Sequence, residues 1–309
     1  MPAGQPFTRL CQHLAQLRAE SQRADLHLHT THSDGRFTPV EVVHRAKERG
    51  LGAIAVTDHD TFAGFPEACA AAAACESAPE IITGVEITCD YSDSVLHLLG
   101  YFFDPDQEKL SAALAELRTR RRERFAAMVA RLPVLGLNVP ESDVHELMSR
   151  EHSLGRPDLA ALLVKHRHAP TTADAFARYL HDGGPLFVPM RGLPVAKAIS
   201  LIRAAGGVTS WAHPPEDANL RQVEELRDNG LGALEAIHPS FTATRERNTR
   251  ALARAAGLAI TGGSDCHGPT PASRAVGSWG VRKPELDALR QRAAQDSRHF
   301  HHSGLASHR

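Results

Sequence analysis

Short aliphatic and β-branched runs alternate with longer amphipathic stretches through most of this sequence, and this alternation limits the possible folds more than any other feature. The pattern is typical of repeated βα units around a parallel sheet. It predicts an α/β protein whose strands close into a TIM-like barrel. The expected strands are 24–29, 53–57, 81–88, 95–102, 207–212, 233–238 and 258–262, with 275–281 as a weaker eighth.

One of the intervening helices carries signals at both ends. Thr38 can act as its N-cap, Pro39 suits the first helical position, and Glu41 completes a capping box. Gly50 is a typical residue just past a helix end. The sequence therefore predicts a helix between Thr38 and Gly50.

The alternation lapses between Asp104 and Pro189, where several consecutive helices are expected instead. This divides the chain into a barrel interrupted by a helical insertion or cap, with additional segments at both ends. The expected bounds are 1–23 for a helical N-terminal extension, 24–104 and 190–297 for the two parts of the barrel, 105–189 for the insertion and 298–309 for a polar tail.

Composition and charge restrict the possible partners. Lys and Arg number 35 against 36 Asp and Glu, so the net charge of −1 favours neither a stable nucleic-acid complex nor binding to a membrane surface. No apolar run approaches the roughly 20 residues that span a bilayer, and the segment before Ala24 lacks the apolar stretch of a signal peptide. We therefore expect a cytoplasmic protein, and no partner protein is inferred. The five cysteines form no CxxC pair, which indicates reduced thiols.

Histidine is unusually frequent, with 19 residues, and its placement points to metal binding. His27 and His29 are two apart on an expected strand, so their side chains point to the same face. Asp34 follows in a turn, where it could close over the same region or simply form the turn. A further histidine, His59, stands between Asp58 and Asp60 at the end of the next strand.

Other ligand-type residues follow later strands in the same way. Most of them fall at or near strand ends, where the catalytic groups of a βα barrel gather. Any one of them alone would more often be an ordinary surface or core residue, but together they exceed the ligand set of a single catalytic zinc ion. They predict two or three ions that share Glu86 as a bridging carboxylate. The candidate ligands are His27, His29, Asp34, His59, Glu86, His97, His213, Asp265 and His267.

Several short strings of this sequence, taken in order, resemble the successive motifs of the PHP (polymerase and histidinol phosphatase) superfamily. They lie between about Ala24 and Val281, and as an ordered set they are highly specific. The strings are Asp25-Leu-His-Leu-His29, Ser33-Asp-Gly35, Thr57-Asp-His-Asp60, Gly84-Val-Glu86, Ala212-His-Pro214 and Gly263-Ser-Asp-Cys-His-Gly268.

The resemblance implies a distorted TIM-like (β/α)7 barrel with a helical insertion, and a trinuclear site. By the resemblance, the first ion would bind His27, His29, Glu86 and Asp265. The second would bind Glu86, His97 and His213, and the third would bind Asp34, His59 and His267. Mixed imidazole and carboxylate ligands accept Mn, Zn or Fe, so the metal remains open.

Within the superfamily the chain is most similar to 3′,5′-nucleoside bisphosphate phosphatases that also act as 5′-to-3′ exoribonucleases. In that branch Arg156 of the Gly155-Arg-Pro157 string would bind a substrate phosphate. The alternative is a structural arginine at a helix start, paired with a carboxylate. The chain departs from the branch at Asp158, where histidine is usual, and at Gly184, where a basic residue is common. Arg191 or Lys197 could replace the lost positive charge.

The predicted chemistry is hydrolysis of phosphate esters by metal-activated water, on nucleoside bisphosphates or the 5′ ends of short oligonucleotides. Asp58 or Asp60 would support the ligands, and His238 would contact the substrate or protonate the leaving oxygen. The alternatives are a monoesterase acting on a compound such as histidinol phosphate, an amidohydrolase, and a non-enzymatic metal-binding module.

Two further features are expected to play no part in catalysis. The run from Arg120 to Arg122 is interpreted as a solvated helix face, because no aromatic residues are interleaved with it. Cys266 stands between two candidate ligands, and strand alternation should point its thiol away from them.

Overall fold

A computed structural model describes residues 23–92 and 94–304 of the chain. The predicted N-terminal helix lies outside the described residues except for Arg23, which begins the first strand. The last five residues of the predicted tail, 305–309, also lie outside them. Residues 298–304, which we expected in the tail, continue the final helix instead.

The strands form one sheet in the order β8-β7-β6-β4-β3-β2-β1-β9, with β5 paired to β3. A parallel bridge between Leu28 and Cys266 brings the segment after β8 against β1, so the sheet nearly closes into a barrel. The predicted α/β barrel fold is confirmed. The strands are β1 (Arg23–Leu28), β2 (Ala53–Val56), β3 (Glu80–Tyr91), β4 (Ser94–Tyr101), β5 (Leu193–Pro194), β6 (Val208–Trp211), β7 (Ala233–Ile237), β8 (Ala259–Gly262) and β9 (Val281–Arg282).

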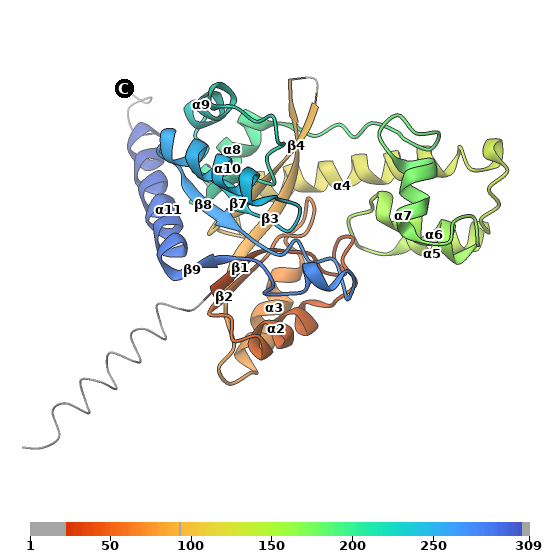
Figure 1. Cartoon of the computed structure of the whole chain (residues 1–309), viewed down its shortest axis with the longest axis horizontal. Helices are drawn as coiled ribbons and strands as arrows, with labels where there is room; N and C mark the ends of the chain where they lie inside the picture. Colours follow the sequence, from red (N-terminus) through yellow and green to blue (C-terminus); the bar gives the residue numbers. More distant parts are fainter. Residues whose placement is uncertain (1–22, 93, 305–309) are drawn as a thin grey trace, which may run out of the picture.

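The strand β4 departs from the predicted parallel arrangement. It pairs antiparallel with β3 and antiparallel with β6, whereas β1, β2 and β3 pair parallel, as do β6, β7 and β8. Only residues 92 and 93 separate β3 from β4, too few for a crossover and suited to a hairpin. In Figure 1 the two strands rise side by side as the longest pair of the sheet.

The prediction of a weaker eighth strand at 275–281 is wrong. Gly277 and Gly280 have φ values of 75° and 154°, outside the range of a regular strand, and only Val281 and Arg282 pair with β1. The short strand β5 was not predicted, because two residues give no periodic signal.

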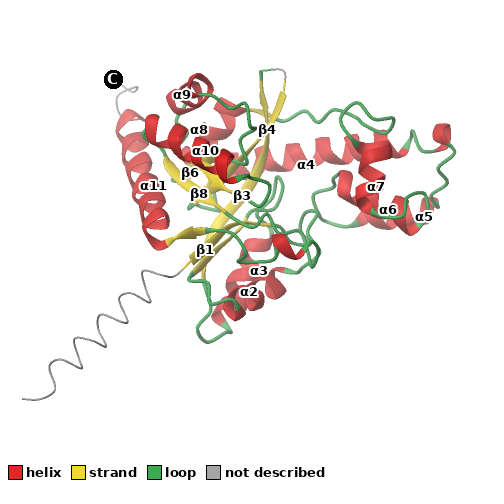
Figure 2. Cartoon of the chain, in the orientation of Figure 1, coloured by secondary structure: helices red, strands yellow, loops and turns green. Residues whose placement is uncertain are grey.

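Helices surround the barrel on most sides, as Figure 2 shows. The predicted capping box is present: Thr38 Oγ1 accepts from the Glu41 N–H at 3.2 Å, Glu41 Oε2 accepts from the Thr38 N–H at 2.8 Å, and the helix begins at Pro39. The α-helices are α2 (Pro39–Glu48), α3 (Gly64–Ala73), α4 (Glu108–Val129), α5 (Glu141–Ser149), α6 (Arg156–Lys165), α7 (Thr172–Ala175), α8 (Val195–Ala204), α9 (Leu220–Asp228), α10 (Ala243–Ala255) and α11 (Lys283–Gly304). The shorter helical turns are η1 (Pro133–Leu135), η2 (Phe176–Leu180) and η3 (Ala272–Arg274).

Helix α4 joins two hydrophobic cores. Its first half places Leu114 and Leu117 in a core shared with the barrel strands and α8. Its second half places Phe125 and Met128 in a separate core with α6 and the chain to Leu186. We call residues 125–188 the helical module. In Figure 1 this module lies to one side of the barrel, connected to it by α4.

No helix within residues 23–92 and 94–304 has the length and apolar character needed to cross a membrane.

Candidate metal centre

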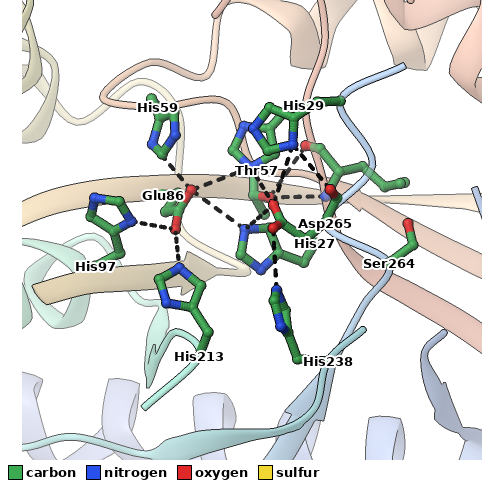
Figure 3. A network of polar contacts seen from close by, with 12 residues as sticks. His27, His29, Thr57, His59, Glu86, His97, His213, His238, Ser264 and Asp265 are labelled. Carbon is green, nitrogen blue, oxygen red and sulfur yellow. Dashed lines mark hydrogen bonds and ion pairs between the residues drawn. The ribbon is translucent and has the colours of Figure 1, made fainter. Parts of the chain in front are cut away.

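The nine predicted ligands come together at one end of the barrel. They lie in β1, β3 and β4 or in the loops that follow β1, β2, β6 and β8, and Figure 3 shows most of them grouped around Glu86 and Asp265. Four of the side chains, those of His27, His29, Glu86 and Asp34, are almost fully buried. Imidazoles and carboxylates brought together in this way form the donor set of a divalent-metal centre.

The first group of donors has the spacing of ligands around one ion. His27 Nε2 lies 3.4 Å from Glu86 Oε2 and 3.5 Å from Asp265 Oδ1, and His29 Nε2 lies 3.3 Å from each of the same oxygens. A tetrahedral ion with bonds of about 2.0–2.1 Å holds its ligand atoms about 3.3–3.4 Å apart. Both Nε2 atoms are buried without a hydrogen-bond partner. These residues fit a metal ion.

Glu86 faces a second group of donors with its other oxygen. Glu86 Oε1 lies 3.0 Å from His97 Nδ1 and 3.1 Å from His213 Nε2. Glu86 Oε2 also lies 3.1 Å from His59 Nδ1, and His59, Glu86 and His97 form a group able to hold an ion. The carboxylate is therefore placed to be shared between sites, as the sequence suggested.

The third group gathers around Asp34. Its Oδ1 lies 3.2 Å from His267 Nε2 and its Oδ2 lies 3.8 Å from His59 Nε2. His29 Nδ1 is 3.7 Å from Asp34 Oδ1, so both His29 and His59 border two groups with their two ring nitrogens. Asp34 Oδ1 and His59 Nδ1 are also buried without a hydrogen-bond partner.

Charge within the centre favours ionised carboxylates. Burial alone would raise the pKa of Glu86, but His59, His97 and His27 around it hold that pKa well below its usual range. The pKa of Asp265 is also lowered, against the effect of burial, by His27 and neighbouring histidines. Burial keeps the pKa of His59 well below its usual range, whereas the surrounding carboxylates raise the pKa of His29 to about 10 despite its burial. Because a ligand imidazole must be neutral, metal binding would release such protons.

Asp58 and Asp60, predicted to support the ligands, are fully buried and hold backbone and side-chain donors in place. Asp58 accepts from the Thr30 N–H at 2.7 Å, Thr30 Oγ1 at 2.6 Å and Ser33 Oγ at 2.6 Å, which fixes the turn that carries Asp34. Asp60 accepts from the Thr88 N–H at 2.7 Å and forms an ion pair with Arg121 at 2.5 Å.

Two carboxylates behind the ligands were not predicted. Glu235 Oε1 lies 2.9 Å from His27 Nδ1, and Glu235 Oε2 accepts from the His213 N–H at 2.6 Å. Asp25 accepts from the N–H groups of Ser264 at 2.9 Å and Gly277 at 2.8 Å, and burial raises its pKa to about 6. Both orient ligand-bearing segments, a role that outer carboxylates commonly take around metals.

The backbone at the centre contains three non-glycine residues in the left-handed region. They are Asp60, His213 and Asp265, with φ values of 54°, 31° and 48°. Each of their N–H groups donates a hydrogen bond. The Asp60 N–H donates to Glu86 O at 2.8 Å, and the Asp265 N–H donates to His27 O at 2.8 Å. The His213 N–H donates to Glu235 Oε2 at 2.6 Å. Uncommon backbone conformations held by neighbouring strands are typical of functional sites.

His238 and Arg274 meet the outer oxygen of Asp265. His238 Nε2 lies 3.2 Å from Asp265 Oδ2, and its Nδ1 lies 2.7 Å from Ser240 Oγ. Arg274 donates to the same Asp265 oxygen. His238 was predicted to belong to the site, whereas Arg274 in η3 was not. Cys266 is buried and its Sγ lies 3.5 Å from Gly268 O, away from the ligand groups.

A cleft of about 1040 Å³ opens beside the metal centre, between the barrel and the helical module. Asp34, His59 and His97 line one part of it. The other part is lined by cations, including the predicted Arg156 and Arg191. Lys197, the other predicted replacement cation, lies on α8 and is not among the lining residues.

Arg156 makes the contacts of a helix-start arginine and also faces the cleft. Its Nη1 donates to Leu180 O at 3.0 Å and to Asp182 Oδ1 at 2.6 Å. Asp158, which replaces the expected histidine, accepts from the Gly155 N–H at 2.7 Å and lies 3.2 Å from His152 Nε2.

The interpretation of Arg120 to Arg122 as a solvated helix face is wrong. Arg121 is buried and bonded to Asp60 and Thr88, and Arg120 donates to Gly192 O at 2.7 Å. Arg122 donates to the backbone oxygens of Met148 and Arg150. The run connects α4 to the barrel and to the helical module, with only part of it in solvent.

The family model of the PHP domain matches residues 25–162. A 5′-3′ exoribonuclease of Haemophilus influenzae is 36% identical over 194 residues, which cover 63% of this chain and 69% of that protein. The chain belongs to the PHP family. A 3′,5′-nucleoside bisphosphate phosphatase of Chromobacterium violaceum is 31% identical, over 82% of this chain and 90% of that protein.

A crystal structure from Bifidobacterium adolescentis, described as that of a metal-dependent phosphoesterase, superposes with a TM-score of 0.80. The two chains are 29% identical, and the match covers 88% of this PHP protein and 96% of the other. With these relatives and its metal centre, this PHP protein is a hydrolase that acts on phosphoester bonds. The non-enzymatic alternative does not hold.

Proposed function

We propose that this PHP protein hydrolyses 3′,5′-nucleoside bisphosphates and the 5′ ends of short oligonucleotides. The observation that carries the proposal is a single cleft lined by the metal centre at one part and by arginines at another. A substrate with one phosphate at the metals and another negative group some distance away suits this arrangement. A simple monoester would use only the metal part of the cleft.

The two substrate classes named for the relatives share a chemical pattern. A nucleoside bisphosphate and a 5′-phosphorylated oligonucleotide both carry a 5′-phosphate and a phosphoester on the 3′ oxygen. Hydrolysis of the 3′ ester yields a nucleoside 5′-monophosphate in both cases. One cleft can therefore serve both reactions if it binds the 5′-phosphate and presents the 3′ ester to the metal centre.

Different residues of the chain would bind the metal ions and hold the ligands in position. His27, His29, Asp34, His59, Glu86, His97, His213, Asp265 and His267 would hold two or three divalent ions. Such ions, when bound, make water a stronger nucleophile and neutralise charge on the phosphoryl oxygens. Asp58, Asp60 and Glu235 keep the ligands in position through the hydrogen bonds described above.

His238 is the proposed proton donor to the leaving oxygen. It is an imidazole beside the metal centre that is not one of the nine ligands, and its Nδ1 is held 2.7 Å from Ser240 Oγ. Its Nε2 points toward Asp265, at the side of the centre where Arg274 also reaches in. A positioned imidazole is the usual group for proton transfer near neutral pH.

Arg156 and Arg191 are proposed to bind substrate phosphate. Arg156 has donors besides the Nη1 that is bonded to Leu180 and Asp182, and it lines the cleft. Its guanidinium carbon lies 5.7 Å from the ring centre of Phe176, which also lines the cleft. A guanidinium group held by a carboxylate on one edge can still present its other edge to phosphate.

The test is phosphate release by the manganese-loaded protein. The substrates are adenosine 3′,5′-bisphosphate, a 5′-phosphorylated oligoribonucleotide, histidinol phosphate and p-nitrophenyl phosphate. We expect the highest kcat/KM with the bisphosphate or the oligonucleotide. Higher values with the two monoesters would contradict the substrate class and leave the metal-dependent hydrolysis intact.

Asp265→Ala serves as the matched control for the metal centre. It should lose bound metal and nearly all activity on every substrate, because Asp265 faces both His27 and His29. A variant that keeps both metal and activity would show that the proposed ligand set is wrong.

A further inference from the structure

Arg124 is a cation of the cleft that sequence reasoning did not single out. It lies on α4, one turn beyond the buried Arg121, and it lines the same cleft as Asp34, His59 and Arg156. Its Nε donates to Val188 O at 2.6 Å, which fixes the side chain along the loop after η2. This hydrogen bond leaves the two terminal nitrogens of the guanidinium group.

Two arginines near Arg124 already have acidic partners. Arg121 pairs with Asp60 at 2.5 Å and Arg156 pairs with Asp182 at 2.6 Å. Within the described part of the chain, no carboxylate lies within ion-pair distance of Arg124, and its terminal nitrogens donate no hydrogen bond. Arg124 therefore presents free donors to the cleft, and the acidic group that acts on its charge, Asp182, is already paired with Arg156.

Arg124 and Arg156 converge on the same part of the cleft. Their guanidinium carbons lie 6.0 Å and 5.6 Å from the ring centre of one aromatic side chain, Phe187. Burial, together with the like charges of Arg156 and Arg121, lowers the pKa of Arg124 to about 10. An anion bound between the two guanidinium groups would relieve the repulsion between their like charges.

The loop beside Arg124 explains why the cation comes from α4. A basic residue at position 184 would be the alternative source, but a Cβ on Gly184 would lie 2.8 Å from the backbone oxygens of both Tyr179 and His181. The Gly184 N–H donates to His181 O at 2.8 Å, and its oxygen accepts from the Phe187 N–H at 2.9 Å. This tight turn has no room for a side chain at position 184.

We propose that Arg124, acting with Arg156, binds the phosphate of the substrate that is not cleaved. This assignment rests on the proposed function, because it presumes a substrate with two phosphate groups. It makes Arg124 a specificity-determining residue: it favours bisphosphates and 5′-phosphorylated ends over compounds with one phosphate. Its terminal N–H groups provide the two-donor edge that phosphate oxygens accept.

The experiment compares Arg124→Gln, Arg124→Lys and Arg131→Gln with the unchanged protein, all loaded with manganese. Arg131 is the matched control because it also donates to this loop, to Phe187 O at 2.6 Å, but does not line the cleft. KM and kcat are measured with adenosine 3′,5′-bisphosphate and with p-nitrophenyl phosphate. The dissociation constant of adenosine 5′-monophosphate is measured by calorimetry.

For Arg124→Gln we expect KM for the bisphosphate and the dissociation constant of the monophosphate to rise about 10- to 100-fold, the usual effect of losing hydrogen bonds to a charged group. The loss in kcat/KM should be at least tenfold larger for the bisphosphate than for p-nitrophenyl phosphate. Arg124→Lys should recover part of the loss, and Arg131→Gln should match the unchanged protein.

Equal losses on both substrates, or an unchanged monophosphate affinity in Arg124→Gln, would overturn the assignment of Arg124. The proposed function fails separately, if the unchanged protein prefers simple monoesters. In that case a weakened monophosphate affinity in Arg124→Gln would still support an anion site at Arg124. A monophosphate that does not bind the unchanged protein would refute it.

Discussion

Replacing Glu235 by Gln would keep the shape of a fully buried side chain while removing one of its two acceptor oxygens. Glu235 Oε1 meets His27 Nδ1 at 2.9 Å, and Oε2 accepts from the His213 N–H at 2.6 Å. When His27 Nε2 serves as a metal ligand, its Nδ1 carries a proton, so Glu235 faces two donors. Gln has one oxygen and one NH2 group, so one of the two donors would face another donor.

The expected loss of manganese affinity follows from the donor that Glu235→Gln leaves without an acceptor. A buried donor left unsatisfied costs about 1–3 kcal/mol. Because about 1.4 kcal/mol corresponds to a factor of ten, we expect the affinity for manganese to fall about 10- to 100-fold. The rest of the ligand set is unchanged, so kcat at saturating metal should fall much less than metal affinity.

The assay is a titration of activity with manganese, from metal-free protein, for Glu235→Gln and for the control Glu225→Gln. Glu225 is an exposed residue of α9 that accepts from the Tyr91 hydroxyl at 3.1 Å. The control should follow the unchanged protein. If Glu235→Gln also bound manganese with unchanged affinity, the reasoning that Glu235 orients His27 and His213 would be refuted.

Three further predictions concern stability and loading. Arg121→Leu should destabilise the fold by about 3–5 kcal/mol in urea unfolding, because it leaves the buried carboxylate of Asp60 without its charged partner; a change below about 1 kcal/mol, the value of an exposed ion pair, would contradict this. Asp58→Asn should weaken metal binding about tenfold, because the turn that carries Asp34 loses an acceptor; unchanged metal content after dialysis would argue against that role. Removing metal with a chelator should lower the thermal midpoint, and manganese should restore it, since ions bound only by the folded state stabilise it; identical midpoints would count against the metal centre.

Much of the candidate metal centre could be located from the sequence, because its residues occur in short strings at strand ends. The spacing of His27 and His29 alone indicates that both side chains face one point. Glu235 could not be found in this way, because it lies within the apolar strand β7 and its role depends on two segments distant in sequence. Asp25 is similar, since its partners Ser264 and Gly277 lie 239 and 252 residues away in the sequence.

The course of β4 and the role of Arg121 were missed for different reasons. An apolar run predicts a strand but not its direction. The antiparallel pairing of β4 with β3 follows from the very short connection between them. For Arg121 a signal was available. Leu114, Leu117, Phe125 and Met128 are all buried, and their helical spacing places Arg121 on the same inward stripe of α4. Three consecutive arginines favour a solvated helix face, and this charge signal conflicts with the periodicity of the buried residues.

The ion pair between Arg121 and Asp60 limits how the helical module of such proteins can change in evolution. Arg121 belongs to the helix that leads into the helical module, whereas Asp60 follows the histidine of a barrel motif. The module could vary in length or be exchanged for another without disturbing the barrel strands, because it has its own core. Any replacement module without this arginine would leave the buried carboxylate of Asp60 without a charged partner beneath the active centre. Natural or designed recombination should therefore preserve Arg121 while the surrounding helices change.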